Sequence, residues 1–182
     1  DNPLYYTVFL GDGSYFGEFD VALFSNQLLP VVYDDPCVTA PNNICVEKGL
    51  YIDTITLPFN PSGYHISYQR CCWANNVDNI INPGDNGITL TTFVPGSDLI
   101  NIYNQGARFI NYPPLVLCSQ NTLNFDHSAY DPDGDSLVYE LVSPLEGGSL
   151  ANVIPNPESP PPYADVQWNT NFSGLVPFGL GS

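Results

Sequence analysis

Short segments of alternating side chains, each ended by Pro or Gly, restrict most strongly how this chain can fold. Residues 64–69 (Tyr-His-Ile-Ser-Tyr-Gln) alternate large and polar side chains, and residues 88–94 repeat the pattern before Pro95. A period of two is typical of a half-buried β-strand. No window of helical length has a 3.6-residue apolar period free of Pro or Gly, and the chain contains 18 Pro and 15 Gly. The sequence therefore predicts an all-β fold of antiparallel strands.

The strand candidates fall into two units. The Tyr-Pro-Pro sequence at 112–114 predicts a boundary, so residues 1–112 are expected to form an immunoglobulin-like antiparallel β-sandwich with about seven strands. Residues 113–182 are expected to hold about four strands, too few to close a second sandwich. The Pro-rich run 155–162 is expected to be an extended connection. The candidate strands are residues 5–10, 19–24, 29–33, 51–57, 64–69, 88–94, 115–117, 122–125, 136–142 and 164–168.

The charge balance narrows the class of partner. The chain has 19 acidic residues against three basic ones (Lys48, Arg70 and Arg108), a formal net charge of -16. Such a surface repels phosphate backbones and anionic lipids, so we expect no nucleic-acid partner and no attraction to a membrane surface. Because 43% of residues are hydrophobic and 13% aromatic, the chain has enough apolar side chains for a folded core. Arg70 is expected to form a buried or half-buried ion pair.

Neither a transmembrane helix nor a secretory leader is visible in the sequence. No 18-residue apolar run occurs, so the chain is not expected to span a membrane as a helix. The start, Asp1-Asn2-Pro3, lacks the basic and apolar regions of a signal peptide. We therefore expect a mature product or an internal piece of a longer protein, with strands that complete the second unit downstream.

A cluster of carboxylates is the strongest candidate for a metal site. Asp131, Asp133 and Asp135 alternate in one turn with Gly134, and Asp126 lies five residues upstream of the first of them. These charges repel one another unless a cation neutralises them. Calcium takes six to eight hard oxygen ligands, and short Asp side chains with backbone carbonyls supply such ligands. We expect a calcium loop between two strands; a solvated acidic turn is the alternative.

The five cysteines favour an oxidising compartment. Without a Cys-x-x-Cys pair, a structural zinc site lacks its usual spacing, and disulfides explain the cysteines better. A bond between Cys37 and Cys45 would close a short loop. One of Cys71 and Cys72 could pair with Cys118, and the odd count leaves a thiol unpaired or paired outside the chain. The sequence leaves this connectivity open.

Three segments resemble a known family. They are residues 45–51, residues 63–72 with the string Tyr-His-Ile-Ser-Tyr-Gln-Arg-Cys-Cys, and residues 125–137. The chain is similar, over roughly residues 44–170, to large secreted surface proteins of Bacteroidetes of the gliding-motility-associated or PKD-like type. The resemblance implies a cell-surface location, export by the type IX secretion system and an all-β repeat architecture. It also implies that residues 113–182 are part of a cadherin/PKD-like domain.

The same resemblance bears on cysteines and on modification. The family usually has cysteines near residues 7–10 and 141–144, which are absent here, so Cys118 becomes the candidate for an unpaired thiol. Thr54 and Ser136 lie in Asp-Ser/Thr-aliphatic triplets like those that Bacteroidetes use for O-glycosylation. Thr54 is the better candidate, because Ser136 would lie beside a bound ion.

Catalysis is not expected. A hydrolase needs a nucleophile, a base and an orienting group together, and only His65 and His127 are available as histidine bases. His65 is expected to be a structural sheet residue and His127 a turn residue. Trp73 and Trp168, with many Tyr, would suit either a carbohydrate platform or ordinary packing.

These inferences lead to one expected function and two alternatives. We expect a non-enzymatic, secreted cell-surface structural or adhesin module, acting as a calcium-stabilised segment of a stalk or filament. Its partners would be other domains of the same large chain or neighbouring copies. One alternative is a self-assembling fibre subunit completed by strand exchange. The other is a module that binds surface glycans.

Overall fold

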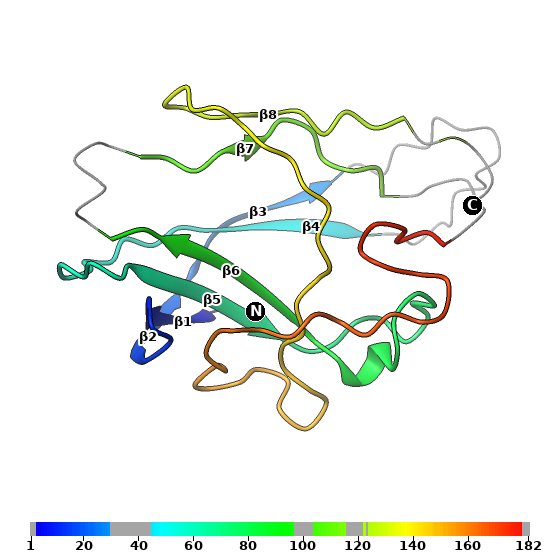
Figure 1. Ribbon diagram of the computed structural model, residues 1–182, viewed down its shortest axis with the longest axis horizontal. Coiled ribbons are helices and arrows are strands. Elements are labelled where there is room, and N and C mark those ends of the chain that lie inside the picture. The colour runs from blue at the N-terminus through cyan, green and yellow to red at the C-terminus, as the bar shows by residue number, and fades with distance from the viewer. Residues whose placement is uncertain (1–2, 30–44, 97–103, 116–121, 123, 180–182) are drawn as a thin grey trace.

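The described chain is almost entirely β-structure (Figure 1). The computed structural model describes residues 3–29, 45–96, 104–115, 122 and 124–179. Within them lie eight strands and one 3-10 helix, which confirms the all-β prediction. They are β1 (Leu4–Leu10), β2 (Tyr15–Val21), β3 (Leu23–Leu29), β4 (Val46–Tyr51), β5 (Tyr64–Arg70), η1 (Pro83–Asp85), β6 (Ile88–Val94), β7 (Arg108–Phe109) and β8 (Ala129–Tyr130).

The strands form three antiparallel sheets. The largest has the order β2-β1-β5-β6, and the other two pair β3 with β4 and β7 with β8. Only Ala22 separates β2 from β3, so the chain passes directly from the first sheet to the second. No helix in the described ranges is long and apolar enough to cross a membrane.

Some of the predicted strands are confirmed and others are wrong. Residues 5–10, 64–69 and 88–94 correspond to β1, β5 and β6. Residues 19–24 are instead split between two sheets. The prediction for 51–57 is also wrong, because β4 ends at Tyr51 and the next residues cross to the first sheet, where Asp53 accepts a hydrogen bond from Tyr6.

The second half contains less regular pairing than the sequence predicts. Residues 136–142 have strand-like composition but form no ladder among the described residues, and residues 164–168 make only isolated bridges. Residues 122, 124 and 125 form no strand either. The candidates 29–33 and 115–117 fall largely outside the described residues. A period-two pattern reports which side chains share a face, and it does not supply the partner strand that a ladder needs.

The two faces of the four-stranded sheet are covered differently. In the register of the sheet, Thr7 lies opposite both Glu18 and Ser67, and Ser67 lies opposite Thr91. Directly opposed residues in antiparallel strands point to the same side, so these four form one row across the sheet. The other face presents Tyr6, Ile66, Tyr68, Leu90 and Thr92.

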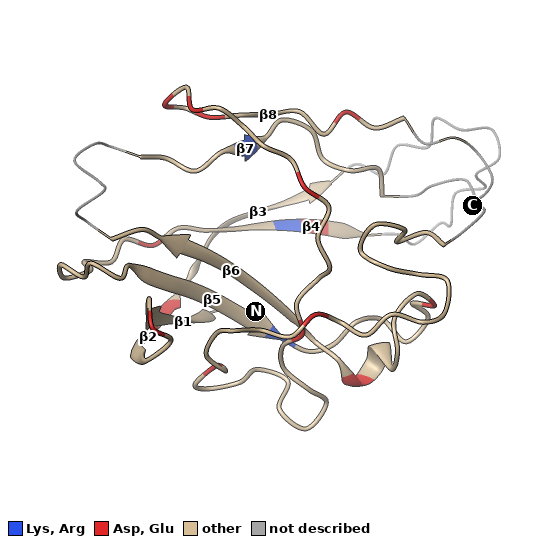
Figure 2. Cartoon of the chain, viewed as in Figure 1, with Lys and Arg blue, Asp and Glu red and all other residues tan. Residues whose placement is uncertain are grey.

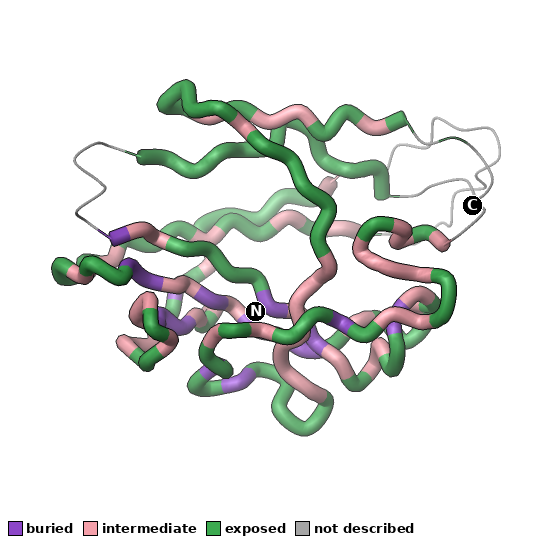
Figure 3. The backbone as a smooth tube through the Cα atoms, in the orientation of Figure 1, coloured by how far each residue is buried: buried purple, intermediate pink, exposed green. Residues whose placement is uncertain are grey.

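The row of polar side chains contains deeply buried residues. Ser67 and Gln69 are each only 1% exposed, as is Thr7, whereas Ile66 and Tyr68 on the opposite face are half-buried. Residues 144–168 cover the polar face, through contacts such as those of Gln69 with Glu158 and Ser159, and Figure 3 shows buried positions along the strands of the sheet.

The covering segment is held by backbone hydrogen bonds. Thr89 N donates to Leu145 O at 3.0 Å, which adds this segment to the edge of β6. Val166 N donates to Pro144 O at 2.9 Å, so the two limbs of the 144–166 loop lie together. Residues 144–169 thus contact β5, β6 and the 71–87 loop. The division into domains 1–112 and 113–182 remains a prediction.

Candidate functional site

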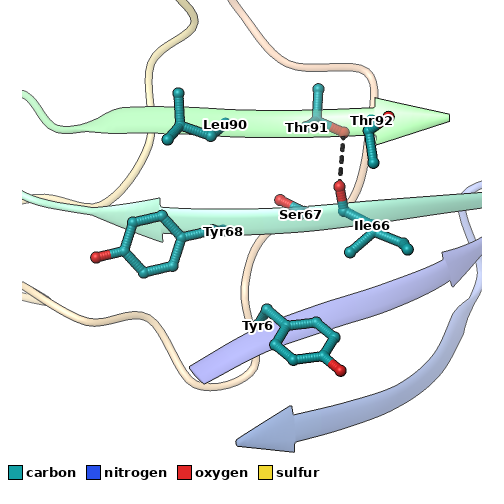
Figure 4. A pocket seen from close by; sticks show the side chains of 7 residues that line it. All are labelled: Tyr6, Ile66, Ser67, Tyr68, Leu90, Thr91 and Thr92. Carbon is teal, nitrogen blue, oxygen red and sulfur yellow. Dashed lines mark hydrogen bonds between the residues drawn. The ribbon is translucent and has the colours of Figure 1, made fainter. Parts of the chain in front are cut away.

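A groove lies on the less buried face of the four-stranded sheet. It has a volume of about 260 Å³ and is lined by residues of three strands. Figure 4 shows Tyr6 on β1, Ile66 and Tyr68 on β5, and Leu90 and Thr92 on β6, with Ser67 and Thr91 also lining it. Tyrosine rings beside the Thr92 side chain combine an apolar contact surface with a hydrogen-bonding group, a mixture that suits an amphipathic ligand.

Tyr6 is fixed at the edge of this groove. Its hydroxyl donates to the Oδ2 of Asp53 at 2.5 Å, and its ring stacks on Phe19 with 5.5 Å between centroids. Burial of the phenol and its hydrogen bond to Asp53 raise the pKa of Tyr6, so it remains a neutral donor. Tyr6 therefore connects β1 to the segment that follows β4.

The predicted calcium loop forms a tight turn after β8. The Oδ1 of Asp131 accepts hydrogen bonds from the amides of Asp133 at 2.8 Å and Asp135 at 3.3 Å. Asp133 accepts from the amide of Gln105 at 2.5 Å. Gly134 has a φ of 84°, and a Cβ atom there would meet no atom within 4 Å. The turn therefore needs glycine for its left-handed backbone conformation and not for space. Amide donors thus offset part of the charge repulsion in the loop.

Asp126 is stabilised by its own local contacts. Its Oδ1 accepts from the amide of Ser128 at 2.9 Å, and its Oδ2 accepts from the Asn111 amide at 3.2 Å. The Ser128 hydrogen bonds lower the pKa of Asp126. In the part of the chain that the structure describes, no group of three or more His, Cys, Asp or Glu side chains is arranged to hold a metal. The oxygen-rich set of Asp126, Asp131, Asp133 and Asp135 suits calcium chemically, and the site remains a prediction.

Two cysteines are paired in a way that the sequence left open. Cys71 and Cys72 are joined to each other at the end of β5, so neither sulfur is left for Cys118. Cys45 is an exposed free thiol, so the short loop that a bond to Cys37 would close is not formed. Cys37 and Cys118 lie outside the described residues.

The remaining predicted residues have these positions. Thr54 and Ser136, the glycosylation candidates, are both exposed. The two tryptophans are half-buried, and their indole N–H groups donate to Gly87 O and to Ser143 Oγ, so their rings pack inside loops. The basic residues lie apart on β4, β5 and β7 (Figure 2), with Arg70 half-buried. Its ion pair remains a prediction.

The histidines make ring contacts. His65 packs on Phe93 across β5 and β6, with 4.8 Å between centroids. His127 lies against Phe125 at 4.4 Å and Phe109 at 6.3 Å. These contacts tie His65 to the first sheet and His127 to the region of β7 and β8.

The segment from 108 to 142 leaves many large apolar side chains exposed. Its ladder consists of the two residue pairs of β7 and β8, and Tyr139 adds a hydrogen bond by accepting from the amide of Ala129 at 2.9 Å. Val138 is 93% exposed and Phe109 is 67% exposed. The others are Ile110, Tyr112, Leu115, Tyr130, Tyr139, Leu141 and Val142. We call these nine residues the apolar surface of residues 108–142.

A buried carboxyl was missed by sequence reasoning. Glu158, in the Pro-rich run, is 5% exposed, and its Oε1 accepts from the amide of Gln69 on β5 at 2.9 Å. No local signal marks it, because its partners lie 89 or more residues away in the sequence. The run is a connection without regular secondary structure, and it also covers the polar face of the sheet.

In comparisons with protein-family models, curated proteins and solved structures, no match to this chain was found. The functional conclusion therefore depends on the chain's own geometry.

Proposed function

We propose that this chain is a non-enzymatic, extracellular structural or adhesin module of a bacterial cell surface, a calcium-stabilised segment of a stalk or filament. In this proposal the sheets belong to an immunoglobulin/cadherin-like sandwich followed by part of a cadherin/PKD-like domain, exported by type IX secretion. The observation that carries the proposal is the apolar surface of residues 108–142, beside a short ladder and an acidic turn.

Two physical arguments support this role. Concentrated exposed apolar side chains are typical of surfaces that contact another protein. A module within a long surface protein would use such a surface to contact adjacent domains of the same chain or neighbouring copies. The adjoining acidic loop, Asp131 to Asp135, would bind calcium only when its turn is formed, so the ion would stabilise this weakly paired region.

Calcium removal tests the proposal. We expect calcium at about 100 times its dissociation constant to raise the free energy of unfolding by about 2.7 kcal/mol, and exhaustive EDTA treatment to remove this gain. Asp131→Asn keeps the Oδ1 acceptor but removes a ligand charge, so it should reduce the calcium effect without destabilising the metal-free protein. Thermal unfolding with calcium and with EDTA measures both.

Asp78→Asn provides the matched control, because Asp78 is an exposed carboxylate outside the loop. It should leave the calcium effect unchanged. An identical melting temperature with calcium and after EDTA would show that the loop is a plain acidic turn.

The same surface also favours the alternative of self-assembly. A subunit completed by a neighbouring copy should associate as its concentration rises, because copies would bury the exposed apolar side chains. Sedimentation velocity on the wild type and on the double variant Phe109→Ser, Leu141→Ser measures this. We expect the double variant to be more monomeric.

Phe24→Ser is the control, since Phe24 is 70% exposed on β3 and lies outside the apolar surface. It should leave the association unchanged. A wild type that stays monomeric at all concentrations, without fibres in electron microscopy, excludes assembly and leaves the stalk or adhesin module.

A further inference from the structure

The buried carboxyl of Glu158 lies where a polypeptide segment covers a sheet. We call residues 155–163 the strap. Figure 1 shows the chain passing below the four-stranded sheet in this region. Pro155 and Glu158 are its buried residues, and Glu158 lies over β1 and β5.

The strap is held mainly through one side chain of the sheet. The Nε2 of Gln69 donates to Ser159 O at 3.0 Å, and its Oε1 accepts from Ser159 N at 3.1 Å. Next to this pair, Gln69 N donates to the Oε1 of Glu158, and Glu158 N donates to the Oγ1 of Thr7 at 3.5 Å. The position of Glu158 is therefore fixed by the hydrogen bonds of its own carboxyl and amide and by those of the neighbouring Ser159.

One half of this carboxyl lacks a partner. The Oε2 of Glu158 is buried and, among the described residues, has no hydrogen-bond partner. The Oγ of Ser67 and the hydroxyl oxygen of Tyr163 are buried in the same condition, and both residues interact with this site electrostatically. Three oxygens without partners share one enclosed region, and a buried polar atom without a partner is unfavourable.

A proton on the Glu158 carboxyl would give these unpartnered oxygens an additional hydrogen-bond donor. A carboxylate is only an acceptor, whereas a carboxylic acid also has one O–H donor. The titratable group that acts on Glu158 is the acidic Glu18 from β2, and Glu158 itself contributes to raising the pKa of Tyr68 on β5 and of Tyr163 in the strap. Glu18 belongs to the row of Thr7 and Ser67, so it shares the face on which Glu158 lies. These surroundings disfavour a second negative charge.

We propose that Glu158 is a proton-dependent lock: the strap binds the sheet with this carboxyl protonated and its O–H donated to Ser67 or Tyr163, and loss of the proton loosens the strap. Burial raises the pKa of Glu158 to about 7, while the nearby Ser67 hydroxyl and the Gln69 amide act in the opposite direction. In the detached strap the carboxyl returns to its ordinary value of 4.5. The bound state therefore holds the extra proton between these two values, and the stabilisation is lost as pH rises through about 7.

Hydrogen exchange in the full chain tests this proposal. The amides of Gln69 and Ser159 report directly on strap binding, because each donates across the contact. After correction for intrinsic rates, we expect their protection to fall about 50-fold between pH 5 and pH 8. Glu158→Gln is neutral at every pH and keeps the Oε1 acceptor, so its protection should be independent of pH and higher than wild type at pH 8.

Two further variants sharpen the test. Glu146→Gln removes another half-buried carboxyl from the covering segment and should keep the wild-type pH profile. Glu18→Gln removes the repulsive neighbour and should shift the fall in protection to lower pH. NMR titration of the Glu158 carboxyl carbon in the wild type tests the proposal even if a variant fails to fold. Equal wild-type protection at pH 5 and pH 8, or a carboxyl carbon titrating near 4.5, would overturn the proposal.

Discussion

Gln69→Ala is expected to lower the free energy of unfolding by about 3 kcal/mol. Gln69 is 1% exposed, and its amide group makes two hydrogen bonds to the backbone of Ser159. Each hydrogen bond contributes about 1 kcal/mol net, and truncation of a fully buried side chain adds the loss of packing around the vacated volume. The same side chain joins β5 to the strap, so the variant should release both together.

Urea denaturation of the wild type and variant measures this difference. Gln167→Ala is the matched control, because Gln167 is the same residue type in an exposed position of the covering segment. Its effect should stay within about 0.5 kcal/mol, as for ordinary surface substitutions. A Gln69→Ala variant as stable as Gln167→Ala would mean that the strap contributes little to the folded state.

Strand β5 shows what the sequence pattern predicts and what it does not. Its alternation correctly predicts a strand and correctly separates its side chains into two faces. The pattern does not say which face is covered, and the deeply buried residues include the polar Ser67 and Gln69 as well as Tyr64 on the other face. Polar side chains become buried when another segment supplies their hydrogen-bond partners, and that segment lies about 90 residues away. No local period encodes such a contact.

The candidate sites show the same division between local and long-range information. The turn at Asp131 is predictable because Asp, Pro and Gly form turns through their own side chains and backbone. Glu158 is not predictable, because its surrounding Pro residues indicate an extended connection and its burial depends on β1 and β5.

Gly87→Ala is expected to destabilise the fold by about 3 kcal/mol, since overpacking against a rigid neighbour costs about 1–3 kcal/mol or more. A methyl group at Gly87 would overlap the carbonyl oxygens of Gly147 and Arg70, which are backbone atoms. Neither carbonyl group can move freely, because hydrogen bonds hold the two segments together on both sides of Gly87. Asn86 forms a β-bridge with Ser149, and Thr89 N donates to Leu145 O at 3.0 Å. The glycine therefore allows the covering segment to approach the start of β6.

Gly106→Ala is the control, because a methyl group there meets no atom within 4 Å and its φ lies outside the left-handed range. It should be neutral or stabilising by up to about 1 kcal/mol, since alanine restricts the unfolded chain more than glycine does. Urea denaturation measures both variants, and hydrogen exchange at the Cys71 amide, which donates to Val153 O at 2.9 Å, locates the damage. If Gly87→Ala matched Gly106→Ala in stability, the covering segment would not need its close approach to β6. Loss of protection at Cys71 in Gly87→Ala alone would instead show that this approach seats residues 144–154 on the sheet.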